Sequence, residues 1–154
     1  MISAPVLITD SCVLIDYAKS AKDALMMLAR EVRVVVPRIL LVEEVHGLSI
    51  DDAPTEALLE AARMPRPLSS FDWLCLILAR DNHWTCVSND KRLRAQCLSV
   101  GVRTQWSLGP LVLLVRRKKL PKERAEKIAR AMAEQNPFIG TRIIRRFISR
   151  IRST

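Results

Sequence analysis

Four acidic residues, each just after an expected strand or on an expected helix, are the residues of this chain best suited to chemistry. They are Asp10, Glu44, Asp72 and Asp90. Carboxylate oxygens without Cys or His suit Mg²⁺ or Mn²⁺, which keep several waters and bridge to phosphate oxygens. If the four acids converge, they form a cation site of the kind that cuts phosphodiester bonds.

Each acid also has a structural interpretation. Asp10 and Asp90 stand where they could N-cap the helices that follow, and Asp72 lies three residues after Ser69, the spacing of a capping box. Glu44 and its neighbour Glu43 could be solvated helix residues. Taken singly, each acid is better explained in this way, whereas the ordered set of four favours a shared site.

The elements that must position these acids alternate between strand and helix. Short apolar or β-branched runs predict strands; these are Val6–Ile8, Val32–Val36, a short extended segment between Pro65 and Ser69, Thr85–Ser88 and Val102–Trp106. Helical spacing predicts the segments between them; these are Ser11–Ala18, Ala21–Arg30, Pro37–His46, Thr55–Met64, Ser70–Asp81 and Lys91–Val100. The pattern predicts a three-layer α/β fold, in which helices cover both faces of a parallel sheet.

A doubly wound sheet of order 3-2-1-4-5 would make the strands before Asp10 and Asp90 neighbours. Their carboxyl ends would then flank the crevice where such sheets bind ligands. Glu44 and Asp72, on helices, could point toward the same edge.

Composition limits the class of protein. The chain has 154 residues, 49% of them hydrophobic and 27% charged, which fits one globular domain. No apolar run approaches the ~20 residues of a membrane span, and acids interrupt the N-terminal segment, so we expect a cytoplasmic protein without a membrane span. The histidines, His46 and His83, share no motif, and we expect the cysteines to be reduced thiols in apolar surroundings; they are Cys12, Cys75, Cys86 and Cys97.

Four blocks of this sequence, in order, resemble those of PIN domains. They are Val6 to Ile15, Val34 to Val45, Leu68 to Arg80 and Cys86 to Arg94. Each contains one of the four acids, and the resemblance covers about residues 5 to 106. The second acid is ambiguous between Glu43 and Glu44; we choose Glu44 because it stands directly before an aliphatic residue, Val45.

The resemblance implies a PIN-like nuclease domain over residues 1–115 and a metal-dependent endoribonuclease, most often the toxin of a bacterial toxin–antitoxin pair of the VapC type. It implies catalytic and metal-binding roles for Asp10, Glu44, Asp72 and Asp90, with Mg²⁺ or Mn²⁺ as cofactor. Ser88 takes the place of a supporting hydroxyl that is more often Thr, and Ser11 is a second supporting residue. RNA is then the substrate, an antitoxin the expected partner, and a homodimer possible.

The last quarter of the chain is strongly basic. Residues 1–115 hold 12 basic and 13 acidic residues, and residues 116–154 hold 13 and 3, so the net charges are −1 and +10. We expect a helical extension over residues 116–154, packed on the same domain, with one helix from Pro121 to about Glu134 and a basic amphipathic helix after Asn136-Pro137.

Three interpretations of that last helix compete. Its apolar stripe could pack on the domain or a second copy with its arginines solvated, its arginines could contact RNA phosphates, or it could lie on a membrane surface. The candidate RNA contacts are Arg142, Arg145, Arg146 and Arg150.

Two other classes compete with the enzyme. A PIN-like module that binds RNA or protein without cutting ranks second. A response-regulator-like receiver would place a phosphoacceptor Asp at the end of the third strand and a Lys after the fifth, where this sequence has Pro65-Arg66-Pro67 and Trp106-Ser107.

Overall fold

A five-stranded, fully parallel sheet forms the centre of the computed structural model, which describes residues 6–37 and 49–154. The strand order is β3-β2-β1-β4-β5, as predicted. The strands are β1 (Val6–Thr9), β2 (Arg33–Pro37), β3 (Ser49–Asp51), β4 (Thr85–Val87) and β5 (Thr104–Gln105). Thr9 pairs with Val87, so the carboxyl ends of β1 and β4 lie side by side.

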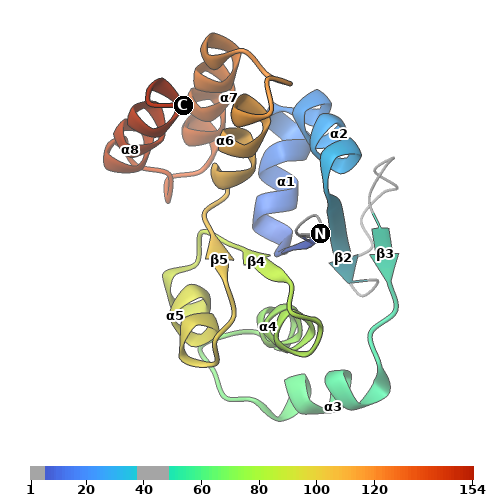
Figure 1. Cartoon of the computed structure of the whole chain (residues 1–154). Coiled ribbons are helices and arrows are strands. Elements are labelled where there is room, and N and C mark those ends of the chain that lie inside the picture. The colour runs from blue at the N-terminus through green and yellow to red at the C-terminus, as the bar shows by residue number, and fades with distance from the viewer. Residues whose placement is uncertain (1–5, 38–48) are drawn as a thin grey trace.

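Eight helices surround this sheet over the described ranges (Figure 1). They are α1 (Ser11–Ser20), α2 (Lys22–Glu31), α3 (Thr55–Arg63), α4 (Ser70–Asn82), α5 (Lys91–Ser99), α6 (Gly109–Arg116), α7 (Lys122–Gln135) and α8 (Thr141–Arg152). None of them combines the length and apolar character needed to cross a bilayer.

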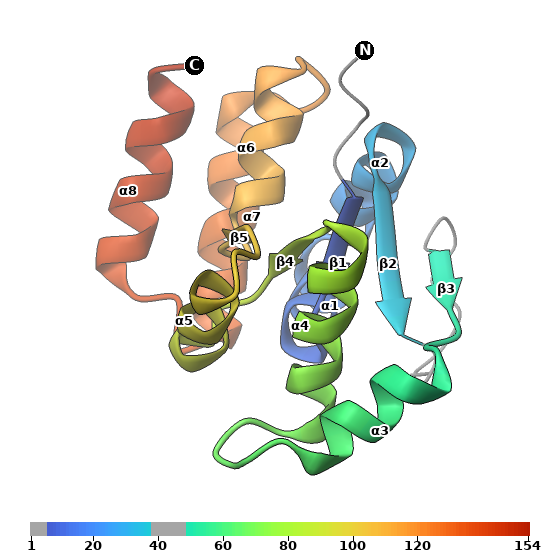
Figure 2. The same ribbon diagram turned by 60° about the horizontal axis from the view of Figure 1, so that its bottom comes forward.

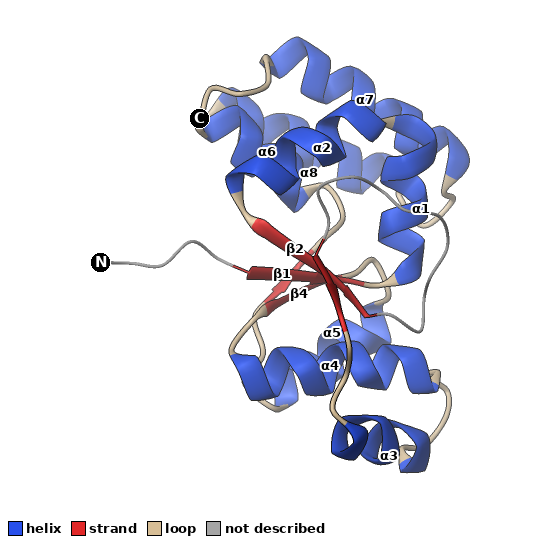
Figure 3. Ribbon diagram, turned by 90° about the vertical axis from the view of Figure 1, so that its right-hand side faces the viewer, coloured by secondary structure: helices blue, strands red, loops and turns tan. Residues whose placement is uncertain are grey.

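The helices divide between the two faces of the sheet (Figure 3). One hydrophobic cluster contains Ile8 and Val35 from the sheet with residues of α3, α4 and α5. The other contains Leu7 and Val34 with residues of α1, α2, α6, α7 and α8. Because successive side chains of a strand point to opposite faces, adjacent residues of β1 and β2 supply both cores.

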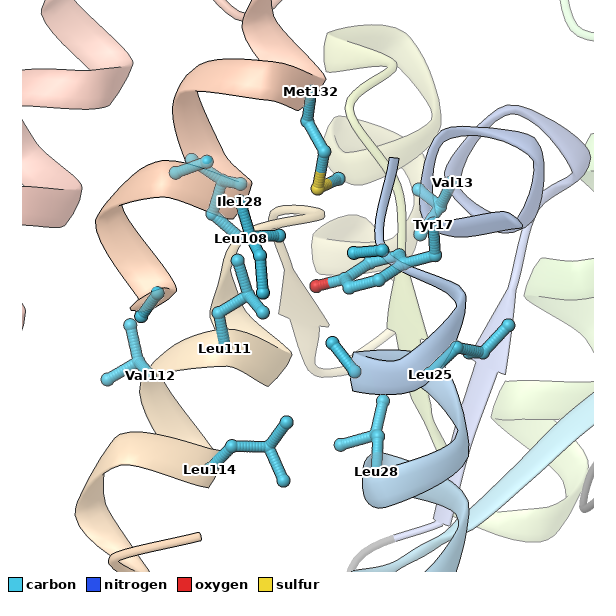
Figure 4. Close-up of a cluster of buried hydrophobic side chains, with 14 of the residues drawn as sticks. Val13, Tyr17, Leu25, Leu28, Leu108, Leu111, Val112, Leu114, Ile128 and Met132 are labelled. Atoms are coloured by element: carbon cyan, nitrogen blue, oxygen red, sulfur yellow. The ribbon is translucent and has the colours of Figure 1, made fainter. Parts of the chain in front are cut away.

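The last three helices extend the layer formed by α1 and α2: α6 packs on α2, α7 packs on α1, and α8 packs on α6 and α7 (Figures 1 and 2). In Figure 4, Tyr17 extends from α1 toward Leu111 of α6, and its buried hydroxyl donates to the Ser107 carbonyl. At the end of α7, the Asn136 amide donates to the buried Asp16 carboxylate at 2.7 Å. Residues 116–154 therefore share one continuous core with the N-terminal helices.

The helices predicted within residues 11–30 and 55–154 agree with the structure, but the third strand was predicted wrongly. β3 is Ser49–Asp51, and the segment between Pro65 and Ser69 is a connection before α4. Among the described strands, β3 pairs only with β2, and a three-residue edge strand has too little length to produce a recognisable alternation. Pro37 also differs from expectation, because it ends β2 instead of starting a helix; the rest of the predicted Pro37–His46 helix lies outside the described residues.

The sheet order changes the argument against a receiver. Asp51 ends the third strand, so a missing acid at that position does not exclude a receiver. Receiver-like sheets run 2-1-3-4-5, with the third strand beside the first. Here β3 is an edge strand, two positions away from β1.

Three of the four cysteines match the prediction. Cys75, Cys86 and Cys97 are buried thiols. Cys12 was predicted to lie in apolar surroundings, but it is exposed near the start of α1.

Candidate metal centre

Asp10 is a buried carboxylate at the carboxyl end of β1. It is only 3% exposed, and its backbone N–H donates to the Val87 carbonyl of β4 at 3.3 Å. The Val13 N–H donates to Asp10 Oδ1 at 2.9 Å, so Asp10 is the N-cap of α1. The Ser88 hydroxyl donates to the other oxygen, Oδ2. Both carboxylate oxygens are thus fixed in position.

Ser88 connects Asp10 to Asp90. Its buried hydroxyl donates to Asp10 and accepts the Asp90 backbone N–H at 2.9 Å. Asp90 caps α5, because its Oδ1 accepts from the N–H groups of Arg92 and Leu93 at 2.8 and 3.4 Å. The hydroxyl of Ser88 therefore contacts the side chain of Asp10 and the backbone of Asp90. Of Ser11, the other supporting residue, the structure describes only the backbone, which begins α1.

Asp72 belongs to the capping box of α4. Ser69 donates to its Oδ2 through the backbone N–H at 3.1 Å and through the hydroxyl at 2.9 Å. The Asp72 N–H in turn donates to the Ser69 hydroxyl at 3.1 Å. The structural interpretation is therefore correct for Asp10, Asp72 and Asp90 alike.

The charges of these three caps nevertheless interact. Burial raises the pKa of Asp10 above its ordinary value; the hydrogen bonds from Ser88 and Val13 oppose this, and the charges of Asp72 and Asp90 add to it. The Cys75 thiol, on α4, donates to the Thr9 carbonyl at 3.7 Å. Burial raises the pKa of Cys75 too, and the charges of Asp10 and Asp72 raise it further. Asp72 is thus near enough to raise the pKa of both Asp10 and Cys75.

The caps leave some carboxylate oxygens available. Asp72 uses Oδ2 for Ser69, and Asp90 uses Oδ1 for α5 and for an ion pair with Arg92 at 3.6 Å. Within the described residues, Asp72 Oδ1 and Asp90 Oδ2 have no hydrogen-bond or ion-pair partner. Capping an α-helix and binding a cation are therefore compatible uses of each side chain.

A complete ligand set is not formed by this part of the chain alone. Among residues 6–37 and 49–154, no three His, Cys, Asp or Glu side chains are close enough together to hold a metal ion. Glu44, and its alternative Glu43, lie outside the described residues. The donor chemistry still fits Mg²⁺, because the acids offer only hard oxygen and Mg²⁺ keeps several waters in place of protein ligands.

Arg94, which contacts Ser88, and Trp106, which contacts Arg94, were not predicted as site residues. Arg94 Nη1 donates to the Ser88 carbonyl at 3.1 Å, and its guanidinium carbon lies 3.8 Å from the centre of the Trp106 ring. Burial lowers the pKa of Arg94, and the nearby Asp90 opposes that shift. Arg94 lies four residues after the cap Asp90, so both lie on one face of the N-terminal turn of α5. This spacing is the feature of the sequence that could have predicted Arg94.

The basic helix α8 packs by its apolar stripe. Ile144, Phe147 and Ile151 are buried in the core shared with α1 and α2, as one of the three interpretations predicts. This leaves no apolar stripe on α8 to enter a membrane surface. The candidate RNA-binding arginines all remain exposed; they are Arg142, Arg145, Arg146 and Arg150.

Comparison with known proteins does not assign the chain to a family. No family model matches it, and neither the curated proteins nor the solved structures give a match.

Proposed function

We propose that this protein is a Mg²⁺-dependent endoribonuclease of the PIN type. The observation that carries the proposal is the arrangement of Asp10, Asp72 and Asp90. Each caps a helix, they are close enough that their charges interact, and two of them keep an oxygen for a ligand. Burial is the largest cause of the raised pKa of Asp10, and the charges of Asp72 and Asp90 add to it, at the sheet edge where parallel α/β sheets bind ligands.

The residues divide into ligands and a positioning residue. Asp10, Asp72, Asp90 and Glu44 would hold the cation. Ser88 positions Asp10 and the start of α5 through the two bonds of its hydroxyl. A bound Mg²⁺ would lower the pKa of a water and neutralise charge on the phosphodiester. In its absence, the mutual repulsion of the carboxylates destabilises the site.

The resemblance to PIN domains extends this proposal to a cellular role. We propose the toxin of a bacterial toxin–antitoxin pair, with RNA as substrate, an antitoxin as partner and a homodimer as a possible assembly. An upstream reading frame for a small acidic or DNA-binding protein would support this role, and its absence would favour a free-standing nuclease.

A non-catalytic PIN-like module that binds RNA or protein is the second candidate. The observation in its favour is that capping alone gives Asp10, Asp72 and Asp90 a structural use. The two candidates differ in what removal of a carboxylate charge does to RNA cleavage.

The decisive variant is Asp90→Asn. Asn is as good an N-cap as Asp, so α5 keeps its first turn while the site loses one charge and one hard ligand. We expect cleavage of labelled RNA in Mg²⁺ to fall about 100-fold or more, because loss of a ligand exceeds the 10- to 100-fold effect of losing an outer-sphere partner. EDTA should abolish cleavage by the parent protein.

A matched control is Asp81→Asn, at the other end of α4, where Asp81 forms only an exposed ion pair with Arg80 at 2.9 Å. This variant should cut RNA like the parent. If a folded Asp90→Asn protein also cuts RNA at the parent rate, the metal-centre assignment is wrong. If no preparation cuts RNA in Mg²⁺ or Mn²⁺, the non-catalytic module is the better description.

A further inference from the structure

A groove opens between α6 and α8. Its volume is about 240 Å³, and it is lined by Trp106, Leu108, Gly109, Val112, Ile143, Arg146, Phe147 and Arg150. Figures 1 and 2 show α6 and α8 side by side on the same face of the sheet. The groove thus combines an apolar floor, one partly exposed indole and two arginines.

Trp106 connects the groove to the acids. It directly follows Gln105, the last residue of β5, whose carbonyl accepts the Ser88 N–H at 3.0 Å. Arg94 bridges the same two places, since it donates to the Ser88 carbonyl and stacks on the Trp106 ring. A polymer lying along the carboxyl edge of the sheet would therefore reach Trp106 from the Asp10–Ser88–Asp90 region.

The two arginines of the groove are available for an anion. Arg146 and Arg150 are four residues apart, so they occupy one face of α8, and both are exposed. Within the described ranges, neither has a carboxylate within ion-pair distance. By contrast, Arg130, on α7, pairs with Glu126 at 3.0 Å. An uncompensated pair of guanidinium groups beside an indole favours phosphate together with a flat ring.

We infer that this groove binds single-stranded RNA, with a nucleobase against Trp106 and the flanking phosphates on Arg146 and Arg150. The inference deepens the proposed ribonuclease function, on which its choice of polymer rests. The groove is smaller than the ~300–1,000 Å³ of sites for drug-sized ligands, which suits one base with its backbone outside. Trp106 is 37% exposed, so its ring can contribute to stacking without unfolding the chain.

The test measures binding in EDTA, where no metal-dependent cleavage can occur. The probes are a short fluorescein-labelled oligouridylate, an abasic oligonucleotide of the same length, and an oligo-glutamate peptide. We expect Arg146→Gln/Arg150→Gln to reduce the salt dependence of oligouridylate binding by about 1.4 in logarithmic slope, since each phosphate contact on a single strand contributes ~0.7.

The matched control is Lys127→Gln/Arg152→Gln, which removes the same charge from positions outside the groove. It should leave the slope unchanged. If both double variants reduce the slope equally, α7 and α8 act as a diffuse polycation and the groove assignment is wrong. If neither does, the arginines are only solvated.

Trp106→Leu separates base recognition from charge. We expect it to weaken oligouridylate binding about 5-fold or more, the lower end of the loss for one stacked base, while the abasic strand binds as before. Equal losses for both strands would overturn the stacking role. Oligo-glutamate binding as tightly as oligouridylate, with the same dependence on Trp106 and Arg146, would show an acidic protein partner instead.

These outcomes are independent of the catalytic proposal. Groove-dependent binding without cleavage in Mg²⁺ would support the groove and refute the nuclease. Cleavage that is insensitive to the groove variants would do the reverse.

Discussion

Charge is handled in opposite ways at the sheet edge and on the last helix. At the edge, Asp10 is held by Val13 and Ser88, and its ionised form is destabilised mainly by burial and further by the charges of Asp72 and Asp90. On α8, the arginines are exposed and the apolar stripe is fixed in the core. Buried charge needs defined partners, whereas exposed charge costs little and is screened by salt. The carboxylate at the edge is thus held in a defined position, whereas the arginines of α8 remain exposed to solvent.

The largest expected effect tests whether α8 is part of the core. Phe147 is 3% exposed in the cluster that joins α8 to α1 and α2. Phe147→Ala should lower the free energy of unfolding by ~3–5 kcal/mol, through lost burial and a residual cavity. Urea denaturation followed by circular dichroism measures this loss.

Arg145→Gln is the control on the same helix and should stay within about 0.5 kcal/mol of the parent, as exposed substitutions do. If Phe147→Ala were equally harmless, α8 would not belong to the folded core. The contrast drawn between the two regions would then fail.

The next effect concerns Ser88, which holds the sheet edge in place. Ser88→Ala leaves the Asp90 N–H and one Asp10 oxygen without their partner, and an unsatisfied buried group costs ~1–3 kcal/mol. Because the Ser88 bond lowers the pKa of Asp10, its loss should raise that pKa further. If Asp10 acts ionised, the acidic limb of the pH–cleavage profile should move to higher pH.

Ser88→Thr keeps the hydroxyl and should restore the profile of the parent protein. Ser99→Ala, at the exposed end of α5, should change neither stability nor profile. A Ser88→Ala protein with a lower stability and an unmoved profile would limit Ser88 to a structural role.

The smallest effect is a gain in stability from Asp10→Asn. Burial raises the pKa of Asp10 in the folded protein above the ordinary value of 3.8, so the folded state binds its proton more tightly than the unfolded state does. Stability therefore falls as pH rises through this range, and the loss is complete above the folded-state pKa. Without metal at neutral pH, Asp10→Asn should raise Tm, and the gain should shrink as pH falls toward 3.8.

Added Mg²⁺ should reverse this order. By mass action, Mg²⁺ at a hundred times its Kd should raise the free energy of unfolding of the parent by about 2.7 kcal/mol, and so raise its Tm. It should leave the Tm of Asp10→Asn nearly unchanged. If Asp10→Asn lowers the Tm by the same amount at all pH values, the folded protein stabilises the Asp10 carboxylate, contrary to the destabilisation expected from its burial.

The sequence predicted the architecture better than it predicted edge detail. Runs such as Val34–Val36 and helical stripes such as Ala125, Ile128, Ala129 and Met132 carry their own periodicity, and the structure confirms both elements. β3 was not predicted, because Ser49–Asp51 is too short to show a period. The third strand was placed instead in the segment that contains Pro65 and Pro67. Cys12 was misjudged because the face of α1 that holds it turns away from the core.

The candidate site was predictable in part for the same reason. Asp10 and Asp90 each end a recognisable strand, and parallel strands place their carboxyl ends together, so their proximity follows from topology. The Arg94–Trp106 stack joins two elements whose separation in space no local pattern encodes. The second acid, Glu44, stays a prediction.

By itself, the sequence determined the parallel α/β class, most of its strands and helices, and the acids that follow β1 and β4, because local periodicity specifies these. Only the tertiary structure decided that the same acids cap helices while keeping free oxygens, that α8 packs by its apolar stripe, and that Arg146 and Arg150 share a groove with Trp106. These features depend on which surfaces of distant segments meet, and burial and electrostatic interaction across that distance are properties of the folded chain.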